Sequence, residues 1–583
     1  MTDPKTPGVY IEEISTLPAS VAAVATAIPA FVGYTEKKVR NRQTLPDNTP
    51  VRITSMLEYI EIFGRAFSEN FDVTLTEPNP GETDISISGA GSLSPYLMYY
   101  QLQMYFTNGG GPCYVVSVGT YAESPSGSDI DVSDLTAGVN ALEEEDEPTL
   151  LVVPESVQLN ATNRKTIYDA LLAQCNKLQD RFAILDTIAA PSTNTVAEDA
   201  SAFRNSDVGM SNLKYGAAYY PSLKTSMNRY YTEGSVVITD DRGGSGTGPY
   251  HNRTLDIIND GDNFADGRII INNTTDLEGY VFTVDSETFE AVSTPGSGSS
   301  DHEFMIEAGP ATTARNLLDA INDADNSAYT AERFSDVIVL TATAESTTPA
   351  LTMTEGSASG AASVSGGGNF TALTADKELY NSIKDMLKHQ ITLYPCGAVA
   401  GIYARVDRQR GVWKAPANVD VRGVREPLVP VSSEEQGGLN VDATSGKSIN
   451  VIRRFAGKGN LVWGARTLAG NDNEWRYVPV RRFFIFVEES VKKATEFVVF
   501  EPNDANTWLR VKTMIENFLS KQWREGALAG ASPDEAFFVK VGLGETMTPQ
   551  DILEGRMNIE IGMAAVRPAE FIILKFSHKL QES

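Results

Sequence analysis

The residues that most often carry enzyme or metal chemistry are few and scattered in this chain. Among 583 residues there are four histidines, which form no close pair and no His-Glu-x-x-His sequence of the kind that holds zinc. The three cysteines, Cys113, Cys175 and Cys396, contain no Cys-x-x-Cys pair. No Gly-x-Ser-x-Gly sequence occurs. We therefore expect no catalytic residues, no metal site and no disulfide framework, and a reducing compartment suits the chain.

Two loops have the composition of ligand-binding segments. Residues 243–248 are rich in glycine but lack the Lys and Ser/Thr of a phosphate-binding loop. Residues 260–267 resemble a calcium loop, but Phe264 and Asp266 break the ligand spacing and the distal Glu is missing. Linker glycine and turn chemistry are the favoured interpretations, so no cofactor is expected.

The charge and the hydropathy pattern exclude two classes of partner. The net charge of −28 argues against direct binding of nucleic acid, because phosphate binding needs a basic face. The longest apolar run, residues 21–32, is interrupted by Pro29 and is too short to span a membrane. The first residues carry Asp3, Glu12 and Glu13 where a secretion signal would carry Lys or Arg. We expect no direct contact with membrane or nucleic acid.

The first third of the chain has the pattern of an α/β fold. Short apolar runs at 150–153 and 182–185 flank a helical stripe at 163–178, and strand, helix, strand in this order predicts parallel pairing. Residues 22–34 and 113–118 are also expected to be strands, and residues 95–106 a helix.

The composition changes at residue 225. Residues 225–376 hold 23 acidic residues against six arginines and no lysine, a net charge of −17. Strand-like runs at 268–271, 280–284 and 337–342 and a helical stripe at 311–323 argue against disorder. We interpret this stretch as an inserted, mostly β surface domain between flexible hinges.

The last two hundred residues read as a second structured part. Expected helices are 380–390, 397–410, 480–500, 506–525 and 548–553, the last with Thr548 and Asp551 as a capping box. Expected strands are 448–453, 460–467, 536–541, 557–563 and 570–577.

Both chain ends look like extended arms suited to strand addition. Val9 and Ile11 share one face of the first arm, and Tyr10 lies on the other. Apolar side chains occupy both faces of the last strand, as in a strand covered on both sides; they are Phe571, Ile572, Ile573, Leu574 and Phe576. The alternative is that both strands pair within their own chain, and the residues alone leave it open.

Several motifs at the two ends resemble one family. Thr6-Pro7-Gly8-Val9-Tyr10-Ile11-Glu12-Glu13 resembles the opening of contractile tail sheath proteins. The stretches 411–418, 477–482 with 487–490, and 569–576 are similar to further motifs of that family, in the same order along the chain. The resemblance covers residues 1–35 and about 380 to 583, and it leaves the acidic insert 225–376 outside.

The resemblance implies a multidomain α/β (α+β) fold, with a sheath-type core of mixed sheets and helices built from the N- and C-terminal parts. The expected domains are an arm at 1–20, an α/β part at 21–224, the insert at 225–376, a core domain at 377–565 and an arm at 566–583. Sheath subunits form stacked hexameric rings around an inner tube, and contraction drives the tube through a target envelope. The arms join neighbouring copies.

The implied partners are therefore copies of the same chain, an inner tube protein, and baseplate and terminal cap proteins. Assembly is expected in the bacterial cytoplasm, in a virion or a phage-tail-like particle that is also released. The alternatives are a surface- or carbohydrate-binding protein that uses the acidic β insert and, with less support, a hydrolase.

One helix of this acidic chain is locally basic. Residues 506–525 carry Arg510, Lys512, Lys521 and Arg524. By analogy with the family, a helix of the C-terminal part faces the inner tube, so these side chains are candidates for gripping an acidic tube surface. An ordinary exposed helix face is the alternative.

Overall fold

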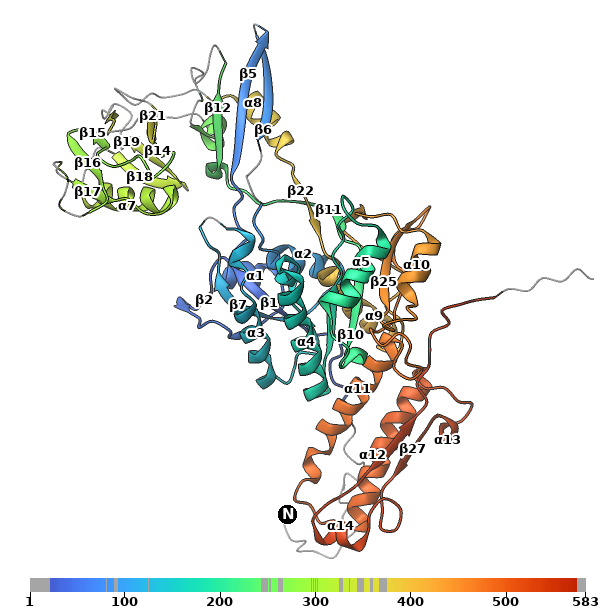
Figure 1. Ribbon diagram of the computed structural model, residues 1–583. Coiled ribbons are helices and arrows are strands. Elements are labelled where there is room, and N and C mark those ends of the chain that lie inside the picture. Colours follow the sequence, from blue (N-terminus) through green and yellow to red (C-terminus); the bar gives the residue numbers. More distant parts are fainter. Residues whose placement is uncertain are drawn as a thin grey trace, which may run out of the picture.

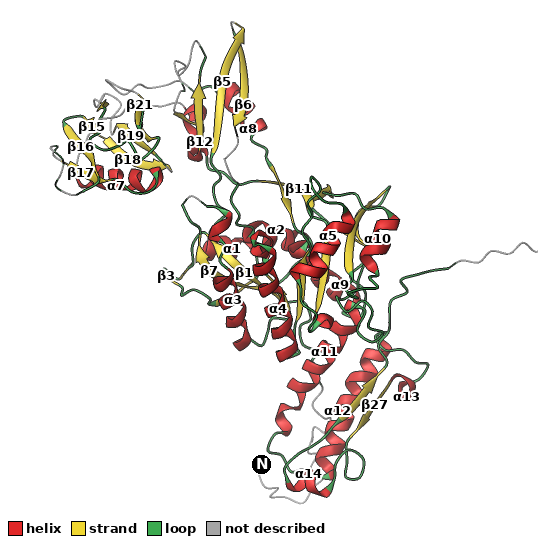
Figure 2. Ribbon diagram, viewed as in Figure 1, coloured by secondary structure: helices red, strands yellow, loops and turns green. Residues whose placement is uncertain are grey.

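The chain folds into three parts, arranged one after another in Figure 1. We call them the body (residues 27–68, 94–228 and 390–476), the outer part (69–93 and 229–389) and the C-terminal domain (477–566). Helices and strands are mixed in the body, strands predominate in the outer part, and two long helices dominate the C-terminal domain (Figure 2). The computed structural model describes residues 21–573 except 80, 89–92, 124, 243–249, 251–252, 261–265, 295, 297, 299, 301, 325–328, 335, 343–350, 357–359 and 366–374.

The body is built on one nine-stranded sheet with the order β23-β26-β25-β10-β9-β8-β1-β7-β4. Its strands are β1 (Pro29–Thr35), β4 (Pro50–Ile53), β7 (Cys113–Thr120), β8 (Leu150–Val152), β9 (Phe182–Asp186), β10 (Gly216–Tyr220), β23 (Val419–Asp420), β25 (Ile449–Phe455) and β26 (Gly459–Val462). The strands from β25 to β7 run parallel, and antiparallel strands close both edges. The predicted α/β fold with parallel pairing is confirmed.

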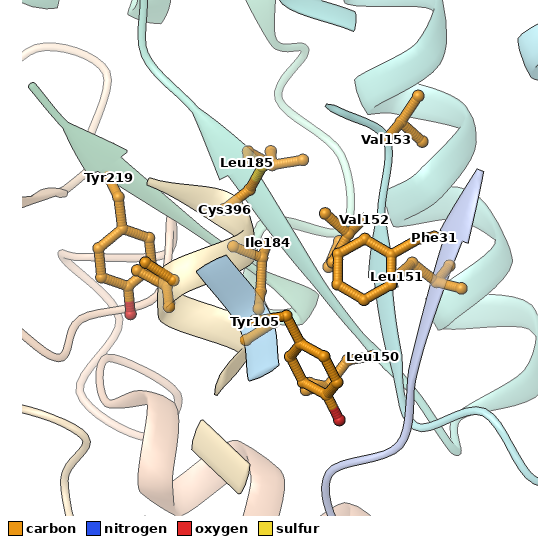
Figure 3. Close-up of a cluster of buried hydrophobic side chains, with 14 of the residues drawn as sticks. Phe31, Tyr105, Leu150, Leu151, Val152, Val153, Ile184, Leu185, Tyr219 and Cys396 are labelled. Carbon is orange, nitrogen blue, oxygen red and sulfur yellow. The ribbon is translucent and has the colours of Figure 1, made fainter. Parts of the chain in front are cut away.

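Helices cover both faces of this sheet. They are α1 (Met56–Phe63), α2 (Met98–Thr107), α3 (Val132–Ala141), α4 (Ala161–Leu178), α5 (Val196–Ala202), α9 (Cys396–Arg410) and α10 (Ser433–Asn440). Phe31 and Val32 are neighbours on β1 and therefore point to opposite faces. The ring of Phe31 lies 5.4 Å from that of Tyr105 in α2 (Figure 3), and Val32 lies against Gly138 in α3. All seven residues of β1 are buried for this reason.

Two glycines bring α9 unusually close to α2. A Cβ atom on Gly397 would lie 2.3 Å from the carbonyl oxygen of Gln101, and one on Gly401 would lie 2.3 Å from that of Tyr105. Only glycine permits this backbone approach. Since α2 and α9 come from the two ends of the sequence, the contact joins the N- and C-terminal parts into one body, as expected.

All chain crossings between the body and the outer part meet at one place. There β11 (Leu223–Asn228) pairs with β22 (Gln390–Leu393) and β24 (Val424–Pro427) in a three-stranded sheet. Arg229 then donates from Nη1 to Glu69 at 2.7 Å and to the carbonyl of Ser94 at 2.9 Å, and from its amide to the carbonyl of His389 at 2.8 Å. We call Glu69, Ser94, Arg229 and His389 the neck.

The outer part begins with a four-stranded sheet of order β13-β12-β5-β6. It consists of β5 (Phe71–Asn79), β6 (Glu82–Ser88), β12 (Val236–Asp240) and β13 (Arg253–Thr254), and it packs on α6 (Leu255–Asp260) and α8 (Lys377–Met386). β5 and β12 are parallel partners although they lie far apart in the sequence. Residues 71–88 therefore lie in the outer part, whereas the sequence placed them in the α/β domain 21–224, because long-range pairing leaves no local signal.

A small lobe completes the outer part. One of its two sheets has the order β18-β19-β14-β21 and the other β17-β16-β15-β20. Its elements are β14 (Asp266–Ile271), β15 (Val281–Val284), β16 (Glu287–Val292), β17 (His302–Met305), α7 (Pro310–Asp323), β18 (Tyr329–Phe334), β19 (Val337–Ala342), β20 (Leu351–Thr354) and β21 (Ala362–Ser365). Its apolar side chains form a separate buried cluster. The strands and the helix predicted within 268–342 are present.

Shorter elements complete the body and its connections. They are β2 (Val39–Arg40), β3 (Gln43–Thr44), a π-helical turn at Phe203–Asp207 and 3-10 turns at Gly127–Asp129, Leu142–Glu144, Pro154–Gln158, Leu213–Tyr215, Glu233–Ser235 and Glu496–Val498. The strand expected at 22–34 begins only at Pro29. The glycine loop 243–248 lies outside the described residues, as do residues 261–265 of the loop 260–267.

Candidate functional site

The C-terminal domain is a pair of helices that carries a small sheet. Its elements are α11 (Val478–Thr495), α12 (Ala505–Arg524), α13 (Pro533–Ala536), β27 (Phe537–Lys540), α14 (Pro549–Leu553) and β28 (Glu560–Met563). The side chain of Asp504 accepts hydrogen bonds from the amides of Asn506 and Thr507 and so starts α12. The capping box predicted for Thr548 and Asp551 is present at α14.

This domain has its own hydrophobic core. The apolar sides of α11 and α12 face each other, and Val539 of β27 joins them, so one face of the sheet is covered by the helices. The main contributors are Phe483, Phe486, Val487, Val511, Met514, Ile515, Phe518 and Leu519. Because this cluster is separate from the core of the body, the domain packs as a unit that the body positions.

Arg482 fixes α11 to the body. Its Nη2 donates to Asp407 in α9 at 2.5 Å and to the carbonyl of Thr26 at 2.7 Å. Its guanidinium carbon lies 4.6 Å from the ring centroid of Tyr403, and the side chains of Arg482 and Asp407 are 3% and 5% exposed. The motif at 477–482 therefore forms the joint between the body and the C-terminal domain.

The small sheet has two strands among the described residues. β27 and β28 are antiparallel partners, in register from Phe537 opposite Met563 to Lys540 opposite Glu560. No third strand from residues 21–573 joins either outer edge, within the part that is described. A sheet of two strands is marginal alone, and its open edges can accept a further strand.

The first described residues of the chain pack on the C-terminal domain. Val21 and Val24 pack against the core of the C-terminal domain, and the amide of Val24 lies 3.3 Å from Oγ of Ser490 in α11. Residues 21–26 therefore follow a helix instead of starting the body sheet, which explains the late beginning of β1. The arm residues Val9, Tyr10 and Ile11 lie outside the described residues.

The C-terminal segment leaves the same domain. The side chains of Phe571, Ile572 and Ile573 are exposed, with 70%, 78% and 80% of their surface accessible. Residues 570–573 belong to no strand, so the strand expected at 570–577 is absent from its described portion. An extended segment without a partner cannot satisfy a ladder of hydrogen bonds. Leu574 and Phe576 lie outside the described residues.

Comparison with known proteins places this architecture. Residues 470–579 match the family model of the phage tail sheath C-terminal domain. The helical sheath of the anti-feeding prophage in its contracted state is 27% identical, with a TM-score of 0.52 over 99% of this chain and 100% of that chain. Residues 470–579 therefore carry a phage tail sheath C-terminal domain, and the chain as a whole is similar to the sheath of a contractile system.

Two further relatives agree with this assignment. The sheath complex of the PVC extracellular contractile injection system, in its contracted state, is 25% identical, with a TM-score of 0.52 over 99% of both chains. The tail sheath protein of Vibrio phage KVP40 is 25% identical over 186 residues, which are 31% of this chain and 26% of that protein. The match thus spans about a quarter of the length of the phage relative and nearly all of the PVC sheath chain.

The candidate tube residues divide into two groups. At about 100° per residue, Arg510, Lys521 and Arg524 project from the same side of α12, and Lys512 from the opposite side. The first three side chains are exposed, whereas Lys512 is half-buried. None of the four forms an ion pair with another described residue. The exposed face therefore presents three positive charges, and Lys512 does not belong to it.

The part of the chain that the structure describes has no metal-binding cluster and no exposed thiol. No group of three or more His, Cys, Asp or Glu side chains gathers there in a way that could hold a metal ion. The thiols of Cys113, Cys175 and Cys396 are buried, and burial raises the pKa of each. Such thiols are poor nucleophiles. No described helix is both long and apolar enough to cross a membrane.

The sequence missed one feature of the C-terminal segment. Glu570 lies beside Arg466, which is 104 residues earlier, and their closest atoms are 2.6 Å apart. The signal that could have pointed to Glu570 is its position, because a single acidic residue opens an otherwise apolar run.

Proposed function

We propose that this chain polymerises as stacked hexameric rings around an inner tube, and that contraction of the rings drives the tube through a target envelope. The main support is the two-stranded sheet β27–β28, whose outer edges have no partner among the described residues. The first described residues pack on the domain that carries this sheet, and the chain leaves the same domain after Val566 and reaches the body at Glu570. The work is mechanical, and no reaction is catalysed.

In this proposal the two arms are donated to adjacent copies. Residues 9–11 and 571–576 add strands to the open edges of β27–β28 in a neighbour. Each added backbone hydrogen bond contributes about 0.5–1.5 kcal/mol, and burying each Ile or Phe side chain adds roughly 1.5–3 kcal/mol. Three or four such contacts would hold two copies together while the bodies rotate. Head-to-tail donation of this kind builds open helical polymers.

The remaining partners follow from the same arrangement. They are the inner tube protein along the bore, and the baseplate and terminal cap at the two ends. Assembly takes place in the bacterial cytoplasm, and the particle is a virion or a phage-tail-like machine. The lobe of the outer part, which carries most of the acidic surplus of 225–376, then lies away from the C-terminal domain (Figure 1).

Electron microscopy of the purified chain tests the proposal. We expect striated tubes or rings, and we expect deletion of residues 1–15 to abolish long tubes while leaving a folded monomer. A matched control replaces Thr2 by Ser, which changes neither the length nor the apolar face of the arm. Unchanged tubes after the deletion would contradict arm donation, and a chain that never polymerises would contradict the function itself.

Disulfide trapping tests where the arm binds. We expect Ile572→Cys on one copy to cross-link with Lys540→Cys or Glu560→Cys on another, since these lie at the ends of β27 and β28. Leu57→Cys is the control, because Leu57 is 76% exposed on α1 of the body. Gel ladders should form only with the strand positions, and equal ladders with the control would reject the acceptor sheet.

Charge reversal tests contact with the tube. We expect Arg510→Glu, Lys521→Glu and Arg524→Glu together to reduce assembly of the sheath on its tube by at least tenfold. Lys512→Glu alone should have no such effect, because its side chain lies on the opposite side of α12. Co-sedimentation with the tube protein provides the measurement, and equal behaviour of both variants would remove this contact from the proposal.

A further inference from the structure

Among the described residues of the C-terminal segment, the last with a side-chain hydrogen bond is Glu570, which is held by three side chains of the body and the joint. Its carboxylate accepts five hydrogen bonds. Arg466 donates from Nη2 at 2.6 Å and from Nε at 2.9 Å. The hydroxyl of Tyr477 donates at 3.1 Å and Nδ2 of Asn440 at 2.8 Å. We call Asn440, Arg466, Tyr477 and Glu570 the clamp.

Arg466 is itself fixed by backbone hydrogen bonds to the side chain of Asn450. Its amide donates to Oδ1 of Asn450 at 2.8 Å, and Nδ2 of Asn450 donates to the carbonyl of Arg466 at 2.8 Å. Asn450 lies in β25 and also donates to the carbonyl of Ala218 in β10, at 3.1 Å. A continuous path of hydrogen bonds therefore leads from Glu570 into the interior of the nine-stranded sheet.

The clamp is a largely buried, charge-assisted contact. The side chains of Arg466 and Glu570 are 5% and 20% exposed. Burial alone would raise the pKa of Glu570, but the hydrogen bonds from Arg466, Asn440 and Tyr477 and the charge of Arg466 hold it below its ordinary value. Glu570 is therefore ionised at neutral pH, and hydrogen bonds between charged groups are the strong ones.

The surroundings of the chain differ before and after Glu570. Before the clamp, the amide of Val566 donates to the carbonyl of Ala527 at 3.1 Å, which is the last backbone hydrogen bond along the described part of the chain. After the clamp come the exposed apolar residues 571–573. Residues 568–572 line a cleft of about 370 Å³ together with Tyr477 and Trp463, so the segment runs along the surface of the body.

We propose that the clamp anchors the C-terminal arm, so that a pull exerted on residues 571 onward by a second copy of this chain passes through Glu570 and Arg466 into the body sheet. This inference rests on the proposed function, because an adjacent copy that holds the arm is what exerts the pull. In this role Glu570 is a positioning residue, and residues 571–576 are the ones that touch the partner.

The clamp also sets the reach of the arm. Without it, the nearest fixed residue is Val566, and residues 567–570 become part of the free arm. Four extended residues add about 13 Å of reach. Two copies linked by the longer arm can then take up a range of separations. The rotation of one copy is therefore coupled less tightly to the rotation of the next.

Spin-label distances measured on the monomer test the anchor. Labels at Met210→Cys and Ile573→Cys, both exposed positions, should give a narrow distance distribution, and the native cysteines are buried. We expect Glu570→Gln to widen the distribution at least twofold, Tyr477→Phe to widen it less, and Glu570→Asp to restore most of the narrow form. Glu554→Gln is the control, since it removes the same charge from an exposed ion pair with Arg556.

The same variants then assemble into tubes for microscopy. Wild-type tubes should have one helical pitch, and tubes of Glu570→Gln should be shorter or variable in pitch. Equal distance distributions in Glu570→Gln and wild type, with identical tubes, would overturn the clamp and leave the proposed function intact. A wild-type chain that forms no tubes would overturn the proposed function, whereas the distance measurement would still decide whether the segment is anchored.

Discussion

The sheet of the body and the sheet of the C-terminal domain end in different ways. The body sheet has nine strands and closes on β23, which has two residues, and on β4, which begins at Pro50. Short edge strands and edge proline discourage further pairing. The C-terminal sheet has two strands of four residues each and no such protection. One sheet is therefore finished within the chain, and the other has room for strands from outside.

The difference indicates where stability and assembly are encoded. The body buries strands on both faces, so its free energy of folding comes from its own packing. The C-terminal domain covers only one face of its sheet and leaves Phe538 44% exposed on the other. Substitutions in the two sheets should consequently separate monomer stability from polymer formation.

The largest expected effect is in the core of the body. Phe31→Ala removes a fully buried ring that packs on Tyr105 (Figure 3) and should lower the free energy of unfolding by about 3–5 kcal/mol. Chemical denaturation provides the measurement. Leu57→Ala, at a position that is 76% exposed, should change the same quantity by less than about 0.5 kcal/mol. Similar effects of both substitutions would contradict the picture of a self-sufficient body.

The body should also respond to pH through Glu155. Burial raises the pKa of Glu155 to about 7, although it accepts hydrogen bonds from the amides of Leu97 and Met98 at the start of α2. A folded-state pKa above the ordinary value means that the folded protein binds this proton more tightly, so stability falls as pH rises from about 4.5 to about 7.

Glu155→Gln should remove this part of the pH dependence. Its stability relative to wild type should rise by up to about 3 kcal/mol between pH 4.5 and pH 7 and stay constant above that. Denaturation curves across this range measure how the stability difference between the variant and wild type changes with pH. A pH-independent cost of the new amide group shifts all values equally and leaves this slope unchanged. A difference that does not change with pH would show that the pKa of Glu155 is the same in the folded body as in the unfolded chain, and it would contradict the raised value.

A smaller effect is expected in the C-terminal sheet. Gly562 lies under Phe538, and a Cβ atom there would come within 2.2 Å of its ring. Gly562→Ala should therefore displace Phe538 and destabilise the β27–β28 pair by about 1 kcal/mol, while the body remains unaffected. Hydrogen exchange of residues 537–540 against 29–35 measures this. Gly542→Ala is the matched control, because its nearest neighbour would be 3.7 Å away.

The smallest effect on the monomer is expected at the arm. Ile572→Ser changes a side chain that is 78% exposed, so the free energy of unfolding should change by less than about 0.5 kcal/mol. Tube formation should nevertheless weaken, since the apolar contact with an adjacent copy is lost. Light scattering of the polymerising protein provides the comparison with Phe31→Ala. A large loss of monomer stability would indicate that residue 572 packs on its own chain.

The strands of the body could be predicted because each is a short apolar run between residues that favour turns. Residues 150–153 and 182–185 were assigned in this way and form β8 and β9. The pairing of β5 with β12 could not, since the two strands are separated by most of the body sequence. Buried and less buried residues alternate along 71–75 in the folded strand, but only the neck brings this strand to its partner.

The candidate site likewise contains some features that could be predicted from the sequence and others that could not. The apolar character of residues 571–573 could be recognised from the sequence, but the sequence left open whether they pair within their own chain. The Arg466–Glu570 contact depends on the path of the C-terminal segment across the body, which is a tertiary property. The separation of Lys512 from Arg510, Lys521 and Arg524 was within reach of the helical period and needed only the boundaries of α12.

The neck has a consequence for the evolution and the engineering of this molecule. The two excursions into the outer part start and finish beside one buried ion pair, Glu69 with Arg229, whose side chains are 2% and 10% exposed. The outer part is thus a cap that the chain crossings of the neck and the ion pairs of Arg315 and Arg333 with Glu123 join to the body. A cap of another size or chemistry could be grafted between residues 229 and 389 without altering any strand of the nine-stranded sheet.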